Sequence, residues 1–378
     1  MDTIRVRDDW KEMLGIPSVA DVVALIPARN EAHQIADTLG SLAKQTTPPD
    51  HILVVADNCT DRTAQVVTDL GYEVFITHDN DYKKAGALNQ ALLQLLPTLD
   101  TEGYVLVMDA DTLLNPEFIE VALSRTGTHI GAVGGSFYAK EEKNLLEILQ
   151  ANEYSRYALE ISRRKNARAN VLTGTGCLFR VDVLLEVQAA RDCGHLPGSG
   201  IYKQDALTED NELTLAIKTL GYEVISPKNC EAHTEAMSDL HSLWVQRIRW
   251  RRGSMEDFRA YGLTKTTAPY IGKMAWSMVV SLASVAYLGL VLDSFARGVN
   301  PFNINTFWLG LIVLYLVDRW WTVKSRPRRG IAVALIFPLE LAYDVFQQAV
   351  FIKALLDFVR HTDQKWVHAP LHRRWEVR

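Results

Sequence analysis

Short apolar runs alternate with helical patterns over the first two thirds of the chain, and longer apolar stretches dominate the remainder. Residues 31–44 and 85–96 have apolar positions at helical spacing. The compact runs between them, which we expect to form buried strands, are Val22–Ile26, Ile52–Val55, Glu73–Ile76 and Tyr104–Met108. Strand, helix and strand in this order, joined by short turns, predict an α/β domain in which helices cover both faces of a mostly parallel sheet.

Polar and acidic residues follow three of these runs at the carboxyl end. They are residues 27–31, 56–61 and 109–111. Ligands of parallel α/β sheets bind at the carboxyl ends of the strands. Each segment alone is typical of a turn or a helix cap, and a cap is our interpretation of Asp61. The three segments together favour one shared site.

Asp109-Ala110-Asp111 is the most informative of these segments. Alternate positions at the end of a strand place both carboxylates on one side of the backbone. Two adjacent carboxylates repel each other unless a cation lies between them. Mg²⁺ or Mn²⁺ takes oxygen ligands, typically one or two carboxylates plus substrate phosphates. We therefore expect a divalent metal site that holds a nucleoside diphosphate and stabilises it as a leaving group.

Five blocks occur in order along the chain: 54–61, Lys84–Asn89, Asp109–Asp111, Thr208–Asp210 and Gln246–Trp250. Together they resemble family 2 of the glycosyltransferases, in the branch of cellulose, chitin and hyaluronan synthases. The specific part is T-E-D followed by Q-x-x-R-W, and the resemblance covers roughly residues 22–258. It implies a GT-A (Rossmann-like) fold and metal-dependent, inverting transfer of a sugar from a nucleotide donor, with UDP preferred.

The resemblance also implies a role for individual residues. Asp210 would be the general base and Asp111 the metal ligand. The residues that would bind the donor are Pro27, Ala28, Arg29, Glu31, Asp57, Lys84, Asp109, Gln246, Arg249 and Trp250. The acceptor would meet Gly174, Thr175, Gly176, Glu209 and Trp250. The chain departs from the family at Ala56-Asp57, where relatives often carry two acids; the second, usually assigned to the nucleobase, is kept.

The residue chemistry supports the same roles and leaves alternatives. Inversion needs a base that takes the proton of the acceptor hydroxyl. Thr208–Asp210 also fits an ordinary N-cap with acids in the first helical turn, and Glu209 is a second candidate for the base. Arg249 offers paired donors suited to a pyrophosphate, and Trp250 offers a flat face for a sugar. The alternative for this helix is a basic surface lying on anionic lipid.

The segment 172–177, Leu-Thr-Gly-Thr-Gly-Cys, has two equal interpretations. Its glycines let a ligand approach the backbone, so it can line the acceptor path. It also fits a turn that leads into a strand at Cys177–Arg180. The sequence alone leaves both open.

Three apolar segments in the last third indicate a membrane region. Met274–Leu292 carries no charge and would form a helix of about 28 Å, which is enough to span a bilayer. Phe302–Val317 is shorter. Ile331–Phe358 is long but carries a polar stripe at helical spacing, which must face protein or water: Glu340, Asp344 and Gln347.

Loop charges orient this region. With a cytoplasmic catalytic domain, the first segment exits, the second returns, and the basic loop 324–329 lies inside. The third segment is expected to bend at Pro338 or lie at the interface, so that the basic tail stays cytoplasmic. The expected organisation is an N-terminal segment (1–21), a GT-A catalytic domain (22–262), an apolar helical membrane-associated region (263–358) and a basic tail (359–378). A soluble homo-oligomer that buries these helices is the alternative.

Composition adds three limits. Residues 1–21 lack the apolar core of a signal peptide, and four scattered cysteines are typical of a reducing compartment. A net charge of −5 gives no indication of nucleic-acid binding. We therefore expect a membrane-associated enzyme whose partners are a nucleotide sugar, a glycan, lipid or protein acceptor, and membrane lipid.

Three functions compete for this chain. The first is repeated transfer that extends a polysaccharide. The second is a single, non-processive transfer to a lipid or protein. The third is a non-catalytic membrane module that binds a nucleotide or a partner. The intact acid set argues against the module, because such a protein needs no base together with a metal ligand: Asp57, Asp109, Asp111 and Asp210.

Overall fold

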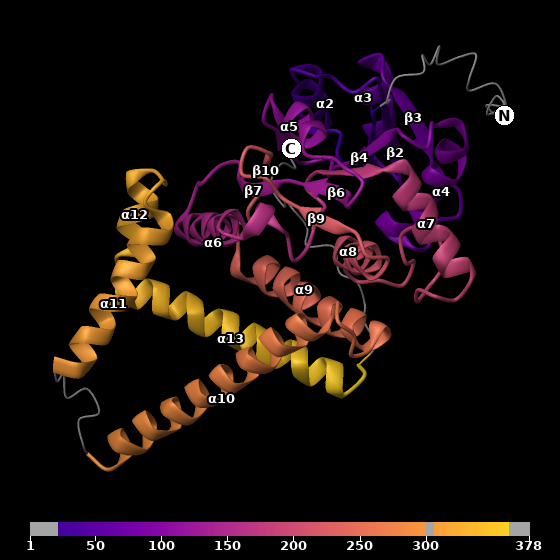
Figure 1. The fold of residues 1–378 in the computed structure, drawn as a ribbon. Helices are drawn as coiled ribbons and strands as arrows, with labels where there is room; N and C mark the ends of the chain where they lie inside the picture. Colours follow the sequence, from indigo (N-terminus) through magenta and orange to yellow (C-terminus); the bar gives the residue numbers. More distant parts are fainter. Residues whose placement is uncertain (1–21, 299–305, 363–378) are drawn as a thin grey trace. The chain divides into compact units, whose positions relative to one another are not determined.

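The computed structural model describes residues 22–298 and 306–362 (Figure 1). The described residues form two compact units: 22–137 with 161–234, and 138–160 with 235–362. These units are groups of residues in contact. The domain boundary near residue 262 is expected from a change in composition along the chain, which grouping by contact does not test. It therefore stays a prediction.

The first unit contains a seven-stranded sheet in the order β3-β2-β1-β4-β8-β6-β9. The strands β3, β2, β1 and β4 are parallel, as are β6 and β9, whereas β8 runs antiparallel to both of its neighbours. The predicted mostly parallel sheet is therefore confirmed. The strands are β1 (Val22–Ala28), β2 (His51–Ala56), β3 (Glu73–Ile76), β4 (Tyr104–Val107), β6 (Ile130–Gly134), β8 (Cys177–Arg180) and β9 (Glu223–Ile225).

Helices cover both faces of this sheet. They are α2 (Ile35–Ala43), α3 (Thr63–Asp69), α4 (Lys83–Leu95), α5 (Phe118–Ser124), α7 (Val181–Asp192) and α8 (Glu209–Thr219). On one face, alternate residues of β1 such as Ala24 and Ile26 join a cluster with α2, α3 and α5. On the other face, Leu53 and Phe75 lie beside Ala91 of α4. Strands buried on both faces explain why the predicted runs are continuously apolar.

A small second sheet has the order β5-β10-β7, from β5 (Leu113–Leu114), β10 (Glu231–Thr234) and β7 (Ser136–Ala139). Its strands are short, and they are absent from the sequence-based expectation. β5 follows the Asp109–Asp111 segment directly. The second sheet therefore fixes the chain just beyond the paired acids.

A buried ion pair joins α7 to α8. Arg191 and Glu212 lie 2.6 Å apart, and neither side chain has any exposed surface. Arg191 also donates to the carbonyl of Pro197 at 2.6 Å. Because α8 begins at Glu209, beside Asp210, this pair holds the helix that presents the expected base.

The second unit is helical. Its members are α6 (Leu145–Ser162), α9 (Leu240–Tyr261), α10 (Ala268–Ala296), α11 (Thr306–Val323), α12 (Arg328–Ala334) and α13 (Phe337–Val359). Asp239 caps α9 by accepting the N–H of Ser242 at 2.9 Å. α9 packs along α13, where the rings of Trp244 and Phe346 lie 5.7 Å apart.

Among the described residues, α10 alone is a single helix long and apolar enough to cross a membrane. α12 and α13 pass the same test only as a pair, and they are bent by 77° relative to each other. The break falls directly before α13, which carries Pro338 in its first turn. A bend of the third apolar segment at this position was predicted and is observed. Residues 302–305 of the second predicted segment lie outside the described residues.

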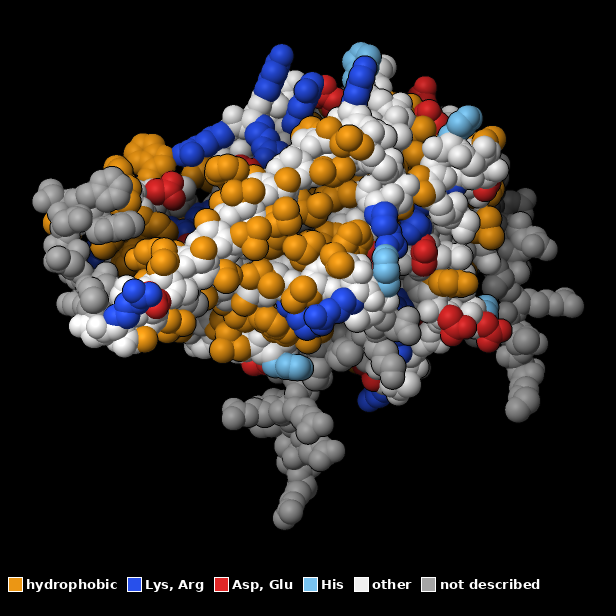
Figure 2. Space-filling model, turned by 90° about the horizontal axis from the view of Figure 1, so that it is seen from below, with side chains coloured by type: hydrophobic (Ala, Val, Ile, Leu, Met, Phe, Trp, Pro, Cys, Tyr) orange, Lys and Arg blue, Asp and Glu red, His pale blue; other side chains and the backbone are white. Residues whose placement is uncertain are grey.

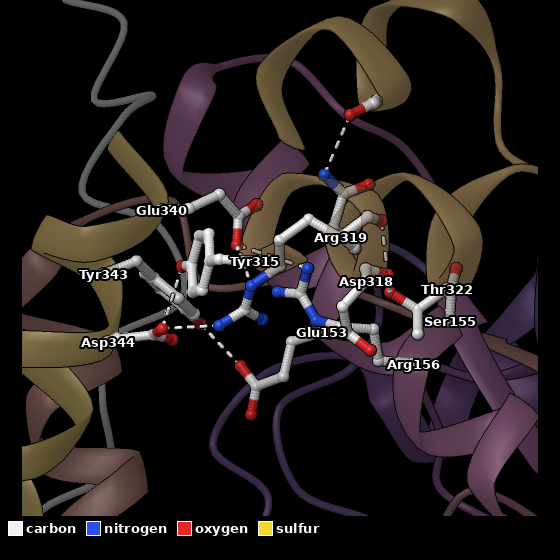
Figure 3. A network of polar contacts seen from close by, with 12 residues as sticks. Glu153, Ser155, Arg156, Tyr315, Asp318, Arg319, Thr322, Glu340, Tyr343 and Asp344 are labelled. Atoms are coloured by element: carbon white, nitrogen blue, oxygen red, sulfur yellow. Dashed lines mark hydrogen bonds and ion pairs between the residues drawn. The ribbon is translucent and has the colours of Figure 1, made fainter. Parts of the chain in front are cut away.

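The polar stripe on α13 faces protein, one of the two environments predicted for it (Figure 3). Glu340 is fully buried and lies 3.3 Å from Arg156 of α6 and 3.6 Å from Arg319 of α11. Arg319 also lies 2.5 Å from Asp344, one turn further along α13. Two arginines and two carboxylates therefore join α6, α11 and α13.

A second polar group continues the stripe. Gln347 donates to Glu153 of α6 at 3.1 Å, and Tyr343 donates to the same carboxylate at 2.5 Å. Arg247 of α9 is buried and forms an ion pair with Glu153 at 3.0 Å. The acid of α6 thus connects α9 with α13.

We predict that Glu212→Ala lowers the free energy of unfolding by about 3–5 kcal/mol, because it leaves the buried Arg191 without its carboxylate. Urea or thermal unfolding of the solubilised protein measures this change. Glu223→Ala removes an exposed ion pair with Arg168 and should change stability by less than about 1 kcal/mol. Equal losses in the two variants would contradict the assignment, and a paired Arg191→Met, Glu212→Leu variant should recover most of the stability.

Candidate active site

The carboxyl ends of β1, β2 and β4 meet at one edge of the sheet. The N–H of Asp57, after β2, donates to the carbonyl of Ala28 at the end of β1, at 2.9 Å. The N–H of Met108, after β4, donates to Leu25 of β1 at 3.3 Å. Pro27 is half-buried in β1, and Arg29 is exposed just beyond it. The segments singled out from the sequence therefore gather as predicted.

Asp57 is buried and held by three donors. Its Oδ1 accepts hydrogen bonds from Thr77 at 2.9 Å, Asn80 at 2.8 Å and Asn58 at 3.1 Å. Asn80 also donates to the carbonyl of Lys83 at 2.7 Å, so it connects Asp57 to the start of α4. The sequence analysis missed Thr77 and Asn80, although both follow β3. The other three segments were singled out because polar residues follow a strand, and the same criterion also applies to Thr77 and Asn80.

Asp61 stabilises the loops around this edge. It accepts the N–H of Thr63, the first residue of α3, at 2.9 Å, and the N–H of Ala32 at 3.1 Å. The N–H of Glu31 donates in turn to the hydroxyl of Thr63 at 2.8 Å. The contact at the start of α3 agrees with a capping role for Asp61. The loop that carries Arg29 and Glu31 is thus tied to the start of α3.

Lys84, in the first turn of α4, links two acidic segments. Its Nζ lies 2.5 Å from Oδ1 of Asp109 and 3.2 Å from Oε1 of Glu209. Burial alone would lower the pKa of Lys84. The carboxylates of Asp109 and Glu209, with a contribution from Asp210, outweigh burial and raise that pKa well above the usual lysine value. Lys84 is therefore charged at any physiological pH.

Gly174 lies against this ion pair and contacts the expected base. Its N–H donates to Oδ2 of Asp210 at 3.1 Å. A Cβ at Gly174 would lie 2.7 Å from Nζ of Lys84 and 3.4 Å from Asp109, so a side chain here would displace the Lys84 ammonium. The other carboxylate oxygen of Asp210 accepts the N–H of Asn211 at 2.8 Å. Asp210 is thus oriented from two sides.

The rest of the Thr-Gly-Thr-Gly loop faces inward. Thr175 is buried, and its hydroxyl lies 2.8 Å from that of Thr173. A Cβ at Gly176 would meet Leu114 at 3.0 Å, on the core side of the loop. Of the three residues expected to meet the acceptor from this loop, Gly174 alone contacts Lys84 or Asp210 in the described contacts. The strand that follows is β8, so the loop is also the turn that the sequence suggested.

The start of α8 is not an ordinary capped helix. Thr208 occupies the N-cap position, but its side chain makes no capping hydrogen bond, and its Oγ1 is buried without a hydrogen-bond partner in the described part of the chain. Glu209 instead faces Lys84, and Asp210 faces Gly174. The segment thus has the position of the predicted cap, with acids in the first turn, but it lacks the side-chain capping hydrogen bond.

Asn89, at the end of the Lys84–Asn89 block, holds a loop. Its side chain donates to the carbonyl of Tyr202 at 2.7 Å and accepts the N–H of the same residue at 2.9 Å. Tyr202 is buried, and a small cavity beside it is lined by Cys177 and Asp210. Burial raises the pKa of the Cys177 thiol, which favours its protonated form. Lys84, at the start of this block, thus lies in the site, whereas Asn89, at its end, holds a neighbouring loop.

The carboxylate oxygens that follow β4 suit a hard divalent cation that takes further ligands from a substrate. Asp111 is half-buried, and its Oδ1 accepts the Thr112 hydroxyl at 3.3 Å. No group of three or more His, Cys, Asp or Glu side chains gathers for a metal within residues 22–298 and 306–362. Carboxylate oxygens at a strand end fit Mg²⁺ or Mn²⁺, which commonly completes its shell with phosphates and water.

The Gln246–Trp250 segment lies on α9 in the second unit. Gln246 is half-buried, and its Oε1 has no hydrogen-bond partner among the described residues. Arg247, between the motif positions, pairs with Glu153 and lies over the Trp250 ring at 4.4 Å from its centre. Arg249 lies two residues further along the helix. Arg247 thus lies between Glu153 and the Trp250 ring within the second unit.

Comparison with known proteins gives a family match. The model of the family described as "Glycosyltransferase like family 2" matches residues 19–253. The poly-beta-1,6-N-acetyl-D-glucosamine synthase of Staphylococcus epidermidis is 25% identical over 301 residues, covering 77% of this chain and 66% of the relative. The beta-monoglucosyldiacylglycerol synthase of Trichormus variabilis is 25% identical over 264 residues, covering 68% of this chain and 53% of the relative. The chain thus spans less than two thirds of these relatives' length.

Among solved structures, the fold is similar to the mannosyltransferase PcManGT from Pyrobaculum calidifontis in complex with GDP-Man and Mn²⁺. The TM-score is 0.58, with 18% sequence identity and coverage of 93% of each chain. At this identity the likeness shows the fold alone. The GT-A α/β fold implied by the sequence resemblance is therefore confirmed.

We predict that Gly174→Ala makes Lys84 more reactive toward an acylating reagent. The new Cβ displaces the flexible ammonium from Asp109, which lowers the pKa of Lys84, and each pKa unit yields about tenfold more reactive neutral amine. Mass spectrometry of the Lys84 peptide measures the rate. Gly40→Ala is the control, because a Cβ added to this residue of α2 would meet no neighbouring atom within 4 Å. Equal rates in wild type and Gly174→Ala would contradict the contact.

Proposed function

Because this chain belongs to the family 2-like glycosyltransferases, we propose that it transfers a sugar from a nucleotide donor to a hydroxyl group with inversion, assisted by a divalent metal. One observation carries the proposal. Asp210 is oriented by the N–H of Gly174, directly beside the Lys84–Asp109 ion pair. The carboxylate proposed as the base and the proposed donor site around Lys84 and Asp109 would then lie together at the edge where α/β sheets bind ligands.

Asp210 is the proposed general base. It takes the proton of the acceptor hydroxyl as the acceptor oxygen bonds to the anomeric carbon. The bond between that carbon and the phosphate oxygen breaks, and the nucleoside diphosphate leaves. The hydrogen bonds from Gly174 and Asn211 fix the carboxylate, so that little reorientation is needed during transfer.

The donor is proposed to bind along the strand ends. Asp57 would receive the nucleobase, near the Pro27–Glu31 segment, and Asp109 would face the sugar or ribose. Asp111 would hold a Mg²⁺ or Mn²⁺ ion, which supplies positive charge to the leaving diphosphate. Gln246, Arg249 and Trp250 complete the proposed donor and acceptor contacts, since an arginine binds a pyrophosphate and a tryptophan stacks on a sugar. Uridine is preferred on the sequence resemblance, and guanosine is the alternative.

The acceptor is proposed to be a growing polysaccharide. The poly-N-acetylglucosamine synthase among the relatives and the Q-x-x-R-W motif both favour this product. A single transfer to a lipid is the alternative, in line with the name of the glucosyldiacylglycerol synthase, and a protein acceptor is a further one. A non-catalytic binding module is a third alternative.

Membrane association is proposed through α10 and α11. Apolar side chains gather over one face of the molecule, with lysines and arginines along its edges (Figure 2). Trp320 and Trp321, near the end of α11, are exposed, and Lys324 lies 3.5 Å from the centre of the Trp321 ring. Aromatic and basic residues beside an apolar helix are typical of a membrane interface. Exposed large apolar side chains of α10 include Trp276, Val279, Leu282, Val285, Leu290 and Phe295.

We predict metal-dependent release of a nucleoside diphosphate from one member of a panel of UDP- and GDP-sugars. Asp210→Asn should lower the rate by about 10²–10⁴-fold, because the amide cannot accept the proton. A coupled assay of diphosphate release, with Mn²⁺ or Mg²⁺ and with membranes as acceptor, measures both. Chelation should abolish turnover, and re-addition of the ion should restore it.

The control for this assay is Glu102→Ala, an exposed residue outside the site. Turnover that survives in Asp210→Asn would remove Asp210 from the role of base. Failure to turn over any donor, even with membranes supplied, would favour the non-catalytic module.

We predict that α10 crosses the membrane while the first unit stays in the cytoplasm. In spheroplasts, a cysteine introduced as Arg297→Cys, at the exposed C-terminal end of α10, should react with a membrane-impermeant maleimide. The exposed native Cys193 of the first unit should react only after permeabilisation. Protection of the introduced cysteine until permeabilisation would show that α10 does not cross.

A further inference from the structure

Glu209 and Asp210 are adjacent in sequence but have different partners. Asp210 faces the backbone of Gly174, whereas Oε1 of Glu209 lies 3.2 Å from Nζ of Lys84. The Glu209 side chain retains 14% exposure and that of Lys84 retains 24%. The carboxylate of Glu209 is thus engaged with an ammonium at the edge of the site rather than pointing into solvent.

Lys84 is confined from three directions. Asp109, after β4, and Glu209, on α8, each contact its ammonium. Gly174 forms the third boundary, because a Cβ there would lie only 2.7 Å from Nζ. These contacts come from three separate parts of the chain. A lysine side chain loses rotamer entropy when it is fixed, so a single carboxylate would hold it less firmly than this arrangement does.

Two other roles for Glu209 fit this geometry less well. Acting as the base, Glu209 would have to turn away from the Lys84 ammonium that its carboxylate contacts. As a direct acceptor ligand, it would have to give up the ion pair. Asp109, which is also paired with Lys84, is the residue proposed to receive the donor. Glu209 is then the partner that retains Lys84 when the donor engages Asp109.

We infer that Glu209 is a positioning residue that holds the Lys84 ammonium at the donor side of the site and so supports donor binding through Lys84. This inference rests on the proposed transferase function. It gives Glu209 a task distinct from those of the base and of an acceptor ligand. It also ties the helix that carries the base to the strand end that carries Asp109 through one cation.

The test is a double-mutant cycle with Glu209→Ala, Lys84→Met and the combined variant. We expect each single variant to raise the donor KM about tenfold, or about 1.4 kcal/mol, with a smaller change in kcat. The combined variant should be no worse than Lys84→Met, because both changes remove the same interaction. Calorimetric titration with the nucleoside diphosphate alone should show the same loss of affinity without any turnover.

Glu209→Gln is the isosteric variant that separates lost folding from lost charge. Its thermal unfolding should match that of wild type, and its donor KM should lie between wild type and Glu209→Ala. Glu102→Ala serves again as the matched exposed control.

Three results would overturn the inference. A loss of kcat by about 10²–10⁴-fold at unchanged donor KM would make Glu209 a base. A change confined to the acceptor KM would make it an acceptor ligand. Additive losses in the combined variant would show that Glu209 and Lys84 act independently. If wild type turns over no donor, the proposed function itself fails, which is a separate outcome.

Discussion

The ammonium of Lys84 is the contact on which the arrangement of this site depends. Parallel strands bring their carboxyl ends to one edge, and α8 adds two more acids to that edge. Carboxylates so close together would repel each other unless a positive charge lay among them. Lys84 supplies that charge from α4, and it contacts acids from two separate segments. One cation thus offsets the repulsion between acids of separate segments.

The second unit uses the same electrostatic principle for a different purpose. Arg156 and Arg319 neutralise Glu340 and Asp344 inside a group of apolar helices. Buried ion pairs of this kind add little net stability, but breaking one leaves an uncompensated charge. They consequently restrict how α6, α11 and α13 can pack. The bend before Pro338 is compatible with this packing, because it directs α13 along α9.

Much of the first unit follows from the sequence because its signals are local. Continuous apolar runs give the strands, and the residues after each strand give the acids of the site. The antiparallel insertion of β8 between β4 and β6 depends on pairing between distant segments, which local periodicity does not encode. The roles of Asn80 and Glu209 likewise depend on the partners that the fold supplies, Asp57 and Lys84. The sequence gives no indication of the direction in which the side chain of Glu209, next to the proposed base, points.

The position of Arg247 has a consequence for how mutational data on this chain should be interpreted. This arginine lies within the Gln246–Trp250 motif, yet it is buried against Glu153 and stacked on Trp250. Its replacement would leave the Glu153 carboxylate without its arginine and would free the indole to rotate. A screen scored by product formation would rank such a variant with those of the reacting groups. Only a parallel measurement of protein abundance would distinguish a misfolded enzyme from a correctly folded but inactive one.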